Sequence, residues 1–352
     1  MKVLIRGCMI LFWVGALFGV LYLSKSFIFR SPQKTINIFS WGDIFDPAYI
    51  NLFERQTGIK VNISYYATNE ELLTKLTATR GVGYDLIVPS DYAVGALRSS
   101  GLLKQLDKNK MSFYEHLNPL LLGLPFDPDN QYSVPFEWEL FGIGINKDYF
   151  GDNIPQPSWS LIFDTAAMPY RIAMVNDPIE AILFAAHYLY GQKAHTIEQL
   201  NTQEIQEIKQ LLIEQKKRVE AYVDFRPDYF LVTKNCPVVV ASSSYILRSM
   251  REYSYIDFIM PVEGTFITIE NFAIPAVSDK EDLVYQFMNF FFEPESCLHH
   301  FNLFAFFPAR LDVIPPLTTI SISPDMFKKL SFFKPVVSEQ QKNDLWVEVK
   351  SS

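Results

Sequence analysis

Residues 35–66, TINIFSWGDIFDPAYINLFERQTGIKVNISYY, contain the unit that decides the fold of this chain. Thr35–Ser40 alternates as a β-strand does, and Lys60–Tyr66 predicts a second strand. Between them, Pro47 to Gln56 has helical spacing with its large apolar side chains broadly on one face, and Gly58 is placed to end this helix. A strand, a helix and a second strand in this order are typical of an α/β fold.

The rest of the chain continues the alternation of strands and helices. Further strands are predicted at Tyr84–Pro89, Ser133–Trp138, Phe141–Asn146, Arg171–Val175, Val238–Ala241, Asp257–Pro261 and Asn271–Pro275. Further helices are predicted after an N-cap at Asn69, after an N-cap at Asp177 over Pro178–Tyr190, and at Ile197–Arg218 and Lys280–Phe292. Two such α/β blocks predict two lobes with a cleft between them, and ligands of open α/β sheets bind beyond the carboxyl ends of the strands.

The composition excludes several classes of protein. Of 352 residues, 49% are hydrophobic and 20% are charged, which allows a sizeable core and excludes a disordered or fibrous chain. The formal net charge of −8 makes nucleic acid or an anionic membrane a poor partner and is compatible with a cationic ligand. Three cysteines are too few for a disulfide scaffold. Cys236 and Cys297 could pair in an oxidising compartment, but two buried, unpaired side chains are the favoured interpretation.

The N-terminus predicts export. Lys2 and Arg6 precede an apolar run over Met9–Leu23, which is typical of a secretory signal. A small-residue cleavage motif ends at Ser26, but the apolar stretch resumes after it and is also long enough to span a bilayer uncleaved. Residues 1–30 are therefore expected to be a signal peptide or an N-terminal membrane anchor, with the body of the protein outside the cytoplasm.

No motif in the chain argues for an enzyme. The Walker A loop, the dinucleotide-binding glycine motif, the H-E-x-x-H zinc motif and the G-x-S-x-G elbow do not occur in the sequence. The adjacent histidines His299 and His300 would point to different faces of a helix, so they do not form a metal site together. No catalytic residue, cofactor or metal is therefore predicted.

Six segments carry a resemblance to a known family. They are Phe39-Ser40-Trp41-Gly42-Asp43, Glu54 through Val61, Asn69-Glu70 with the leucine-rich helix, Tyr84 through Tyr92, Pro125 through Asn146, and Phe272-Ala273-Ile274-Pro275. In this order and spacing, the chain from Thr35 to Phe292 resembles the periplasmic polyamine-binding proteins, which are the spermidine/putrescine receptors of ABC importers.

The resemblance implies a two-lobed periplasmic-binding-protein fold that closes on its ligand by a hinge motion, with hinge strands near Ser133–Trp138 and Glu263–Asn271. Lobe 1 would comprise residues 35–138 plus 270–310, and lobe 2 residues 139–269 plus 311–352. A polyamine would be bound in the cleft and delivered to a membrane permease pair served by a cytoplasmic ATPase, without a reaction. The protein is expected to be a periplasmic monomer, either free or anchored to the inner membrane by its N-terminal segment.

The resemblance also assigns ligand contacts by position. They are Trp41, Asp43, Ser90, Tyr92, Asp177, Glu180 and Glu270. Carboxylates form charge-assisted hydrogen bonds with ammonium groups, and aromatic faces cover the methylenes between them. Asp177 and Glu180 lie one helical turn apart, so both carboxylates face the same side. Each residue also has a structural explanation, because Asp177 could cap its helix and Trp41 or Tyr92 could belong to the core.

Several aromatic residues of the family's site are replaced in this chain. Ile44 stands where the family carries Tyr, and Ser242–Ser244 and Thr268 stand where it carries Trp. Three interpretations are open: a polyamine held more loosely, a different cation such as a shorter diamine, or walls rebuilt from other positions. The candidates for rebuilt walls are Phe136, Trp138, Tyr245 and Phe266.

Other classes of function fit parts of the pattern. Within the same fold, the chain could be a receptor for another small cation or nutrient. Asp177 and Glu180 could serve as the acid and base of a hydrolase, but two carboxylates on the same side suit salt bridging better. A membrane-anchored structural protein would not need acidic and aromatic side chains at strand ends.

Overall fold

The computed structural model describes residues 12–15, 17, 34–42, 44–166, 169–313 and 324–352. The strands are β1 Thr35–Trp41, β2 Lys60–Tyr66, β3 Leu86–Ile87, β4 Ser133–Asn146, β5 Ile172–Val175, β6 Val219–Val223, β7 Val238–Ser242, β8 Ile256–Ile259, β9 Thr265–Ala273, β10 Phe307–Pro308 and β11 Leu330–Ser331. The helices are α2 Pro47–Thr57, α3 Asn69–Thr79, α4 Asp91–Ser99, α5 Lys147–Phe150, α6 Ser160–Phe163, α7 Pro178–Tyr190, α8 Thr202–Lys216, α9 Tyr229–Val232, α10 Ser243–Met250, α11 Glu281–Phe291, α12 Pro294–Phe304, α13 Pro324–Phe327 and α14 Glu339–Ser351.

The signal peptide or anchor predicted for residues 1–30 falls on a segment that lies largely outside the described residues. Across the part of the chain that the structure describes, no helix combines the length and apolar character needed to cross a membrane.

The strands form a mixed sheet in the order β2-β1-β3-β9-β4-β7-β5-β6. β1 pairs in parallel with β2 and β3, and β5 pairs in parallel with β6 and β7. β4 and β9 are antiparallel to each other and to their outer neighbours β7 and β3. Two parallel blocks are thus joined through an antiparallel pair, and the predicted α/β class is confirmed.

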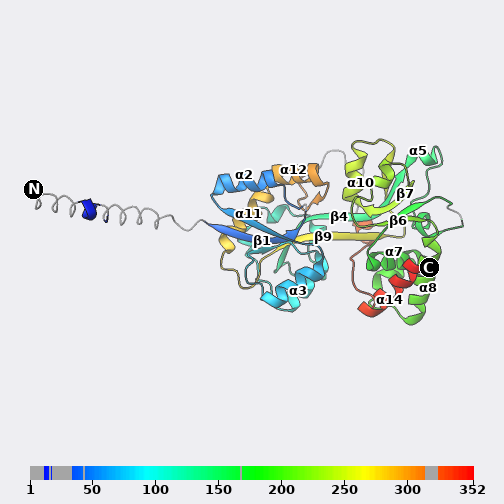
Figure 1. Cartoon of the computed structure of the whole chain (residues 1–352), viewed down its shortest axis with the longest axis horizontal. Coiled ribbons are helices and arrows are strands. Elements are labelled where there is room, and N and C mark those ends of the chain that lie inside the picture. The colour runs from blue at the N-terminus through cyan, green and yellow to red at the C-terminus, as the bar shows by residue number, and fades with distance from the viewer. Residues whose placement is uncertain (1–11, 16, 18–33, 43, 167–168, 314–323) are drawn as a thin grey trace, which may run out of the picture.

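Figure 1 shows two lobes, with β4 and β9 running from one to the other. The first lobe carries β1, α2, α3, α11 and α12, and the second lobe carries β6, β7, α5, α7, α8, α10 and α14. Residues 133–140 of β4 pair with β9, whereas residues 141–145 pair with β7. Each lobe therefore builds its sheet on the same continuous strand.

Two of the predicted strand boundaries are wrong in an informative way. The separate strands predicted at Ser133–Trp138 and Phe141–Asn146 are one strand, because residues 139–140 between them also pair with β9. β9 begins at Thr265, well before the predicted start at Asn271. In both cases polar residues interrupt the apolar pattern of the sequence without ending the hydrogen-bonded ladder.

Capping chemistry sets two helix ends where the sequence predicts them. The Asp177 side chain accepts hydrogen bonds from the N–H groups of Ile179 and Glu180, so α7 begins directly after it. Gly58 ends α2 with a φ of 71°, in the left-handed region that glycine adopts without a steric penalty.

Two other helix starts differ from the prediction. The cap of α3 is Thr68, whose hydroxyl accepts the N–H of Glu71, so Asn69 is the first helical residue. The helix predicted at Ile197–Arg218 is shorter, because Asn201 forms a reciprocal capping box with Glu204 and starts α8 at Thr202.

Aromatic side chains fill the cores of both lobes. In the first lobe Phe136 stacks on Phe272 with ring centroids 4.3 Å apart, and in the second lobe Phe266 stacks on Phe333 at 4.6 Å. Such pairs add about 0.5–1.5 kcal/mol each to the burial of their apolar area. Cys236 and Cys297 are both buried and free, which confirms the favoured interpretation of these residues.

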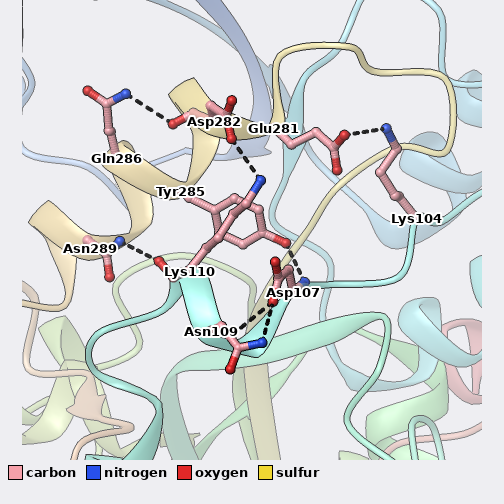
Figure 2. A network of polar contacts seen from close by, with 9 residues as sticks. All are labelled: Lys104, Asp107, Asn109, Lys110, Glu281, Asp282, Tyr285, Gln286 and Asn289. Carbon is pink, nitrogen blue, oxygen red and sulfur yellow. Dashed lines mark hydrogen bonds and ion pairs between the residues drawn. The ribbon is translucent and has the colours of Figure 1, made fainter.

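A polar network ties α11 to the segment that precedes β4 (Figure 2). Lys110 pairs with Asp282 at 2.8 Å, and Lys104 pairs with Glu281 at 3.2 Å. The Tyr285 hydroxyl accepts the backbone N–H of Asp107 at 2.6 Å. Because its ion pairs are exposed, this network contributes little to stability, about 0–1 kcal/mol per pair. It fixes a loop at a surface of the first lobe.

Replacing Gly142 on β4 by alanine should destabilise the protein. A Cβ atom there would lie 2.8 Å from Cε2 of the Phe258 ring and 2.9 Å from the backbone oxygen of Ile259. Gly142→Ala should lower the free energy of unfolding by about 1–3 kcal/mol through overpacking, as measured by urea unfolding.

The matched control is Gly95→Ala on α4, where the added Cβ would meet Phe126 at an ordinary 3.5 Å. This variant should keep or raise stability by up to about 1 kcal/mol, because alanine favours the helix. Equal stability of the two variants would contradict the close packing of β4.

Candidate functional site

Three of the predicted ligand contacts meet at the end of the first lobe's sheet. Trp41 is the last residue of β1, Ser90 follows β3, and Glu270 lies on β9, where it forms a β-bridge with Ser90. The Trp41 Nε1–H donates to Glu270 Oε2 at 2.8 Å, and the Ser90 hydroxyl donates to Glu270 Oε1 at 2.8 Å. The parallel strands β1 and β3 end at the same edge of the sheet, which brings both donors to one carboxylate.

Burial raises the pKa of Glu270 well above its ordinary value, against the opposing effect of the Ser90 hydrogen bond. The neighbouring carboxyls of Asp91, Glu137 and Glu139 raise it further. The two hydrogen-bond donors therefore do not compensate fully for the loss of water around the Glu270 carboxylate. A bound cation would stabilise its ionised form further.

Tyr92 lies at the start of α4 and is half-buried. Its hydroxyl donates to Oε1 of Glu70, on the first turn of α3, at 2.8 Å. Asp91 beside it is buried and accepts the backbone N–H of Ile269 on β9 at 3.1 Å. Burial raises the pKa of Asp91 to about 7. Asp91 thus fastens α4, which also carries Tyr92, to β9.

The ring of Trp41 packs against Tyr66, with centroids 4.6 Å apart. The Tyr66 hydroxyl donates to the backbone oxygen of Val88 at 2.5 Å, which fixes that ring. Trp41 is half-buried, so one part of the indole packs on the lobe and another part remains available.

The two acids of the second lobe lie on the first turn of α7. Asp177 accepts the N–H groups of Ile179 at 2.7 Å and Glu180 at 3.0 Å, so its capping role is confirmed. Burial raises the pKa of Glu180 well above its ordinary value, and the carboxyls of Asp177, Glu139 and Asp224 add to this. Burial also raises the pKa of Asp177, against the hydrogen bonds from the two N–H groups and the charge of Lys342, and Glu70 of the first lobe adds to the rise.

Sequence reasoning missed two acids on β4, the strand that runs between the acids of the first lobe and those of the second lobe. Glu137 and Glu139 lie on β4, and the Glu139 carboxyl raises the pKa of both Glu180 and Glu270. Burial raises the pKa of Glu139 itself to about 6, opposed by hydrogen bonds from the Ser244 and Ser242 hydroxyls. The available signal was a pair of acids two residues apart within an apolar strand.

Glu137 is buried and paired. Its Oε2 lies 2.7 Å from His300 Nδ1, and the other ring nitrogen of His300 contacts the backbone oxygen of Ile44. Burial by itself would lower the pKa of His300, but the Glu137 carboxylate outweighs it and raises the pKa. His300 is thus the positive partner of Glu137 and ties the segment after β1 to β4.

The acids at the junction have few positive partners. Among the ion pairs of the described residues, none involves Glu139, Glu180 or Glu270. The described part of the chain also contains no group of three His, Cys, Asp or Glu side chains that could hold a metal ion. Asp43, the remaining predicted contact, lies outside the described residues.

Two of the four candidates for rebuilt aromatic walls lie in the cores. Phe136 is 3% exposed and Phe266 is 1% exposed, so neither can line a site. Trp138 is half-buried, stacks on Phe307 at 4.6 Å and donates its Nε1–H to the backbone oxygen of Pro308. Tyr245 is also half-buried; burial raises the pKa of its hydroxyl, and the charge of the nearby Glu139 raises it further.

Comparison with known proteins adds independent information. The chain matches the family described as bacterial extracellular solute-binding protein over residues 48–328. It is 30% identical over 284 residues to the spermidine/putrescine-binding periplasmic protein of Salmonella typhimurium, covering 79% of this chain and 78% of that protein. It is 28% identical over 347 residues to the putrescine-binding periplasmic protein SpuD of Pseudomonas aeruginosa, covering 91% and 93%.

Solved structures agree in fold. The spermidine/putrescine ABC transporter substrate-binding protein PotD of Streptococcus pneumoniae superposes with a TM-score of 0.76 at 24% identity, covering 90% of this chain and 99% of that chain. The Tp0655 (TpPotD) lipoprotein of Treponema pallidum superposes with a TM-score of 0.72 at 23% identity, with the same coverage. The two-lobed architecture and the family match over most of the chain lead to one conclusion: this chain belongs to the bacterial extracellular solute-binding protein family.

Proposed function

We propose that this chain is the extracytoplasmic substrate-binding component of an ABC transporter, and that it binds a polyamine between its lobes. The observation that carries the proposal is a set of carboxyls from both lobes that raise one another's pKa where the lobes meet, at β4 and β9. Glu270 comes from β9, Glu180 from α7 and Glu139 from β4, and burial raises the pKa of each. Like charges held together out of water are unfavourable until a cation joins them.

A polyamine has the chemistry that this arrangement favours. It carries an ammonium at each end, and methylenes lie between them. Glu270, with Trp41 and Ser90 around it, would bind one ammonium, and Asp177 and Glu180 would bind the other through charge-assisted hydrogen bonds. The faces of Trp41 and Tyr92 would cover the methylenes and add about 0.5–2 kcal/mol per cation contact. Asp43 is retained as a proposed contact from the first lobe.

The proposed lobes are residues 35–138 plus 270–310 and residues 139–269 plus 311–352, with β4 and β9 as the hinge. The course of these two strands between the lobes supports this division. Ligand binding would draw the carboxyls of both lobes onto one cation and favour the closed arrangement.

The proposed partners are a membrane permease pair and its ATPase, with this chain acting as a monomer. The periplasmic relatives support a place outside the cytoplasm. We propose that residues 1–30 direct export, either as a cleaved signal or as an anchor in the inner membrane. The relatives are binding proteins of transport systems rather than enzymes, so the hydrolase interpretation of Asp177 and Glu180 is not retained.

Isothermal titration with putrescine, cadaverine, spermidine and spermine tests the proposal, with lysine and thiamine as controls. At least one polyamine should bind with a Kd of about 1 μM or lower, as expected for a site with several charge-assisted contacts. A folded protein that binds none of the polyamines would contradict the proposal, and heat with thiamine alone would indicate another cation.

Removing one carboxylate charge should weaken polyamine binding without unfolding the protein. Glu270→Gln or Asp177→Asn should each weaken binding by about 1.5–3 kcal/mol, because each variant removes one charge-assisted contact. The measurement is the Kd by titration, with circular dichroism to verify the fold.

The matched control is Glu281→Gln, which removes an equal charge from the exposed network on α11 (Figure 2). The control should bind the polyamine as the native chain does. Unchanged affinity in both site variants would show that the ligand binds elsewhere.

The unliganded protein should become more stable on mild acidification. Burial raises the pKa of Glu139 to about 6, and it raises the pKa of Glu180 and Glu270 well above the ordinary value. In this range the folded state binds more protons than the unfolded state, so the free energy of unfolding rises as pH falls. The raised pKa of His300 acts in the same direction. The Tm should therefore increase from pH 8 to about pH 5.5.

A bound polyamine should reverse this dependence. Its ammonium groups favour the ionised carboxyls, so binding releases protons and the affinity falls as pH decreases through about 6. Thermal shifts with and without spermidine across this pH range give both slopes. A Tm that falls throughout the acidification of the unliganded protein would contradict the carboxyl cluster.

A further inference from the structure

Glu139 occupies a defined place on the β4–β9 ladder. It lies directly opposite Thr268 in the register, and two residues earlier Glu137 lies opposite Glu270. Residues directly opposite each other in an antiparallel pair share one face of the sheet, as do residues two apart on the same strand. All four side chains therefore belong to the same face of the strands that connect the lobes.

The acceptors on this face are unequally satisfied. Glu137 already has His300 as a positive partner, and Glu270 already accepts hydrogen bonds from Trp41 and Ser90. Oε2 of Glu139 and Oγ1 of Thr268 are buried atoms without a hydrogen-bond partner in the described part of the chain. The carboxylate oxygens of Glu137 also lack a hydrogen bond, but Glu137 has the ion pair with His300, whereas Glu139 has none among the described residues. Burying polar atoms without a partner is unfavourable, so those of Glu139 and Thr268 point to donors that a ligand would supply.

The side chains of Thr268, Ser242 and Ser244 bring hydroxyl groups close to Glu139. The hydroxyls of Ser242 and Ser244 lie 3.0 Å apart, and both serines lower the pKa of the Glu139 carboxyl against the larger effect of burial. A carboxylate surrounded by hydroxyls favours an N–H donor that carries a positive charge.

Glu139 also lies within electrostatic range of both proposed anchors of the ligand. Burial is the largest cause of the raised pKa of Glu270 in the first lobe and of Glu180 in the second lobe, and the Glu139 carboxyl adds to both. A cation bound at Glu139 would therefore belong to the middle of a ligand whose ends reach those two acids. A secondary ammonium inside a polyamine has one positive charge and two N–H donors, which matches two unpartnered acceptors on opposite strands.

We propose that Glu139 and Thr268 form a subsite for an internal secondary ammonium, so that this chain selects linear triamines over diamines. The inference rests on the proposed function and specifies its substrate. Glu139 accepts one N–H and provides the negative charge, and Thr268 accepts the other N–H. The subsite thereby recognises the positive charge between the two terminal ammonium groups.

The test compares spermidine with octane-1,8-diamine. The diamine has the same chain length and the same terminal ammonium groups, but a methylene replaces the internal amine. The full chain should bind spermidine roughly tenfold or more tightly than the diamine, as expected for one charge-assisted contact in a buried site. Equal affinities would overturn the inference.

Two variants locate the discrimination. Glu139→Gln should reduce the ratio of the two affinities to about threefold or less, chiefly by weakening spermidine. Thr268→Val, which preserves the shape and removes the hydroxyl, should reduce the ratio in the same direction. If Glu139→Gln does not fold, Thr268→Val and the comparison of ligands on the native chain still decide the outcome.

The matched control is Glu180→Gln, which removes an equal charge from one end of the site. It should weaken both ligands alike and leave their ratio unchanged. A ratio that falls equally in Glu180→Gln and Glu139→Gln would overturn the inference, because it would reflect the total charge alone. A folded chain that binds neither ligand nor putrescine overturns the proposed function and the inference together, whereas equal binding of both ligands overturns the inference alone.

Discussion

The antiparallel pairing of β4 with β9 is the constraint on which the rest of the structure depends. Both strands run between the lobes, and their register decides which side chains share the face at the junction. A one-residue slip of one strand against the other would place Glu139 and Glu270 on opposite faces of the sheet. The irregularity between Pro135 and Glu137 lets Phe136 pack in the core beside Phe272 while Glu137 stays opposite Glu270.

Partial desolvation raises the pKa of the carboxyls on and beside the β4–β9 pair. The aromatic cores on either side exclude water, and burial is the largest cause of the raised pKa of Glu139, Glu180 and Glu270. Hydrogen bonds from Trp41, Ser90 and the serines before and within α10 offset part of that cost. The remainder is offset when a cation binds, so the same burial that weakens the empty protein strengthens its attraction for a polyamine.

Local sequence signals predicted much of the fold. The strand at Lys60–Tyr66, the helix at Pro178–Tyr190 with its Asp177 cap, and the end of α2 at Gly58 agree with the structure, because backbone geometry and capping act within a few residues. The continuity of β4 could not be predicted in this way. Its polar centre is held by β9, which begins more than a hundred residues later in the chain.

By itself, the sequence determined the α/β class, the order of the elements and the side chains that could bind a cation, because periodicity, caps and motifs are local properties. Tertiary structure alone decided which of those side chains meet. It joined Trp41 and Ser90 to Glu270, it placed Phe136 and Phe266 in the cores, and it added Glu139, whose neighbours on β9 lie far from it in the sequence. The physical reason is that strand register and burial depend on residues far apart in the chain, and these set both the neighbours and the charge of each carboxyl.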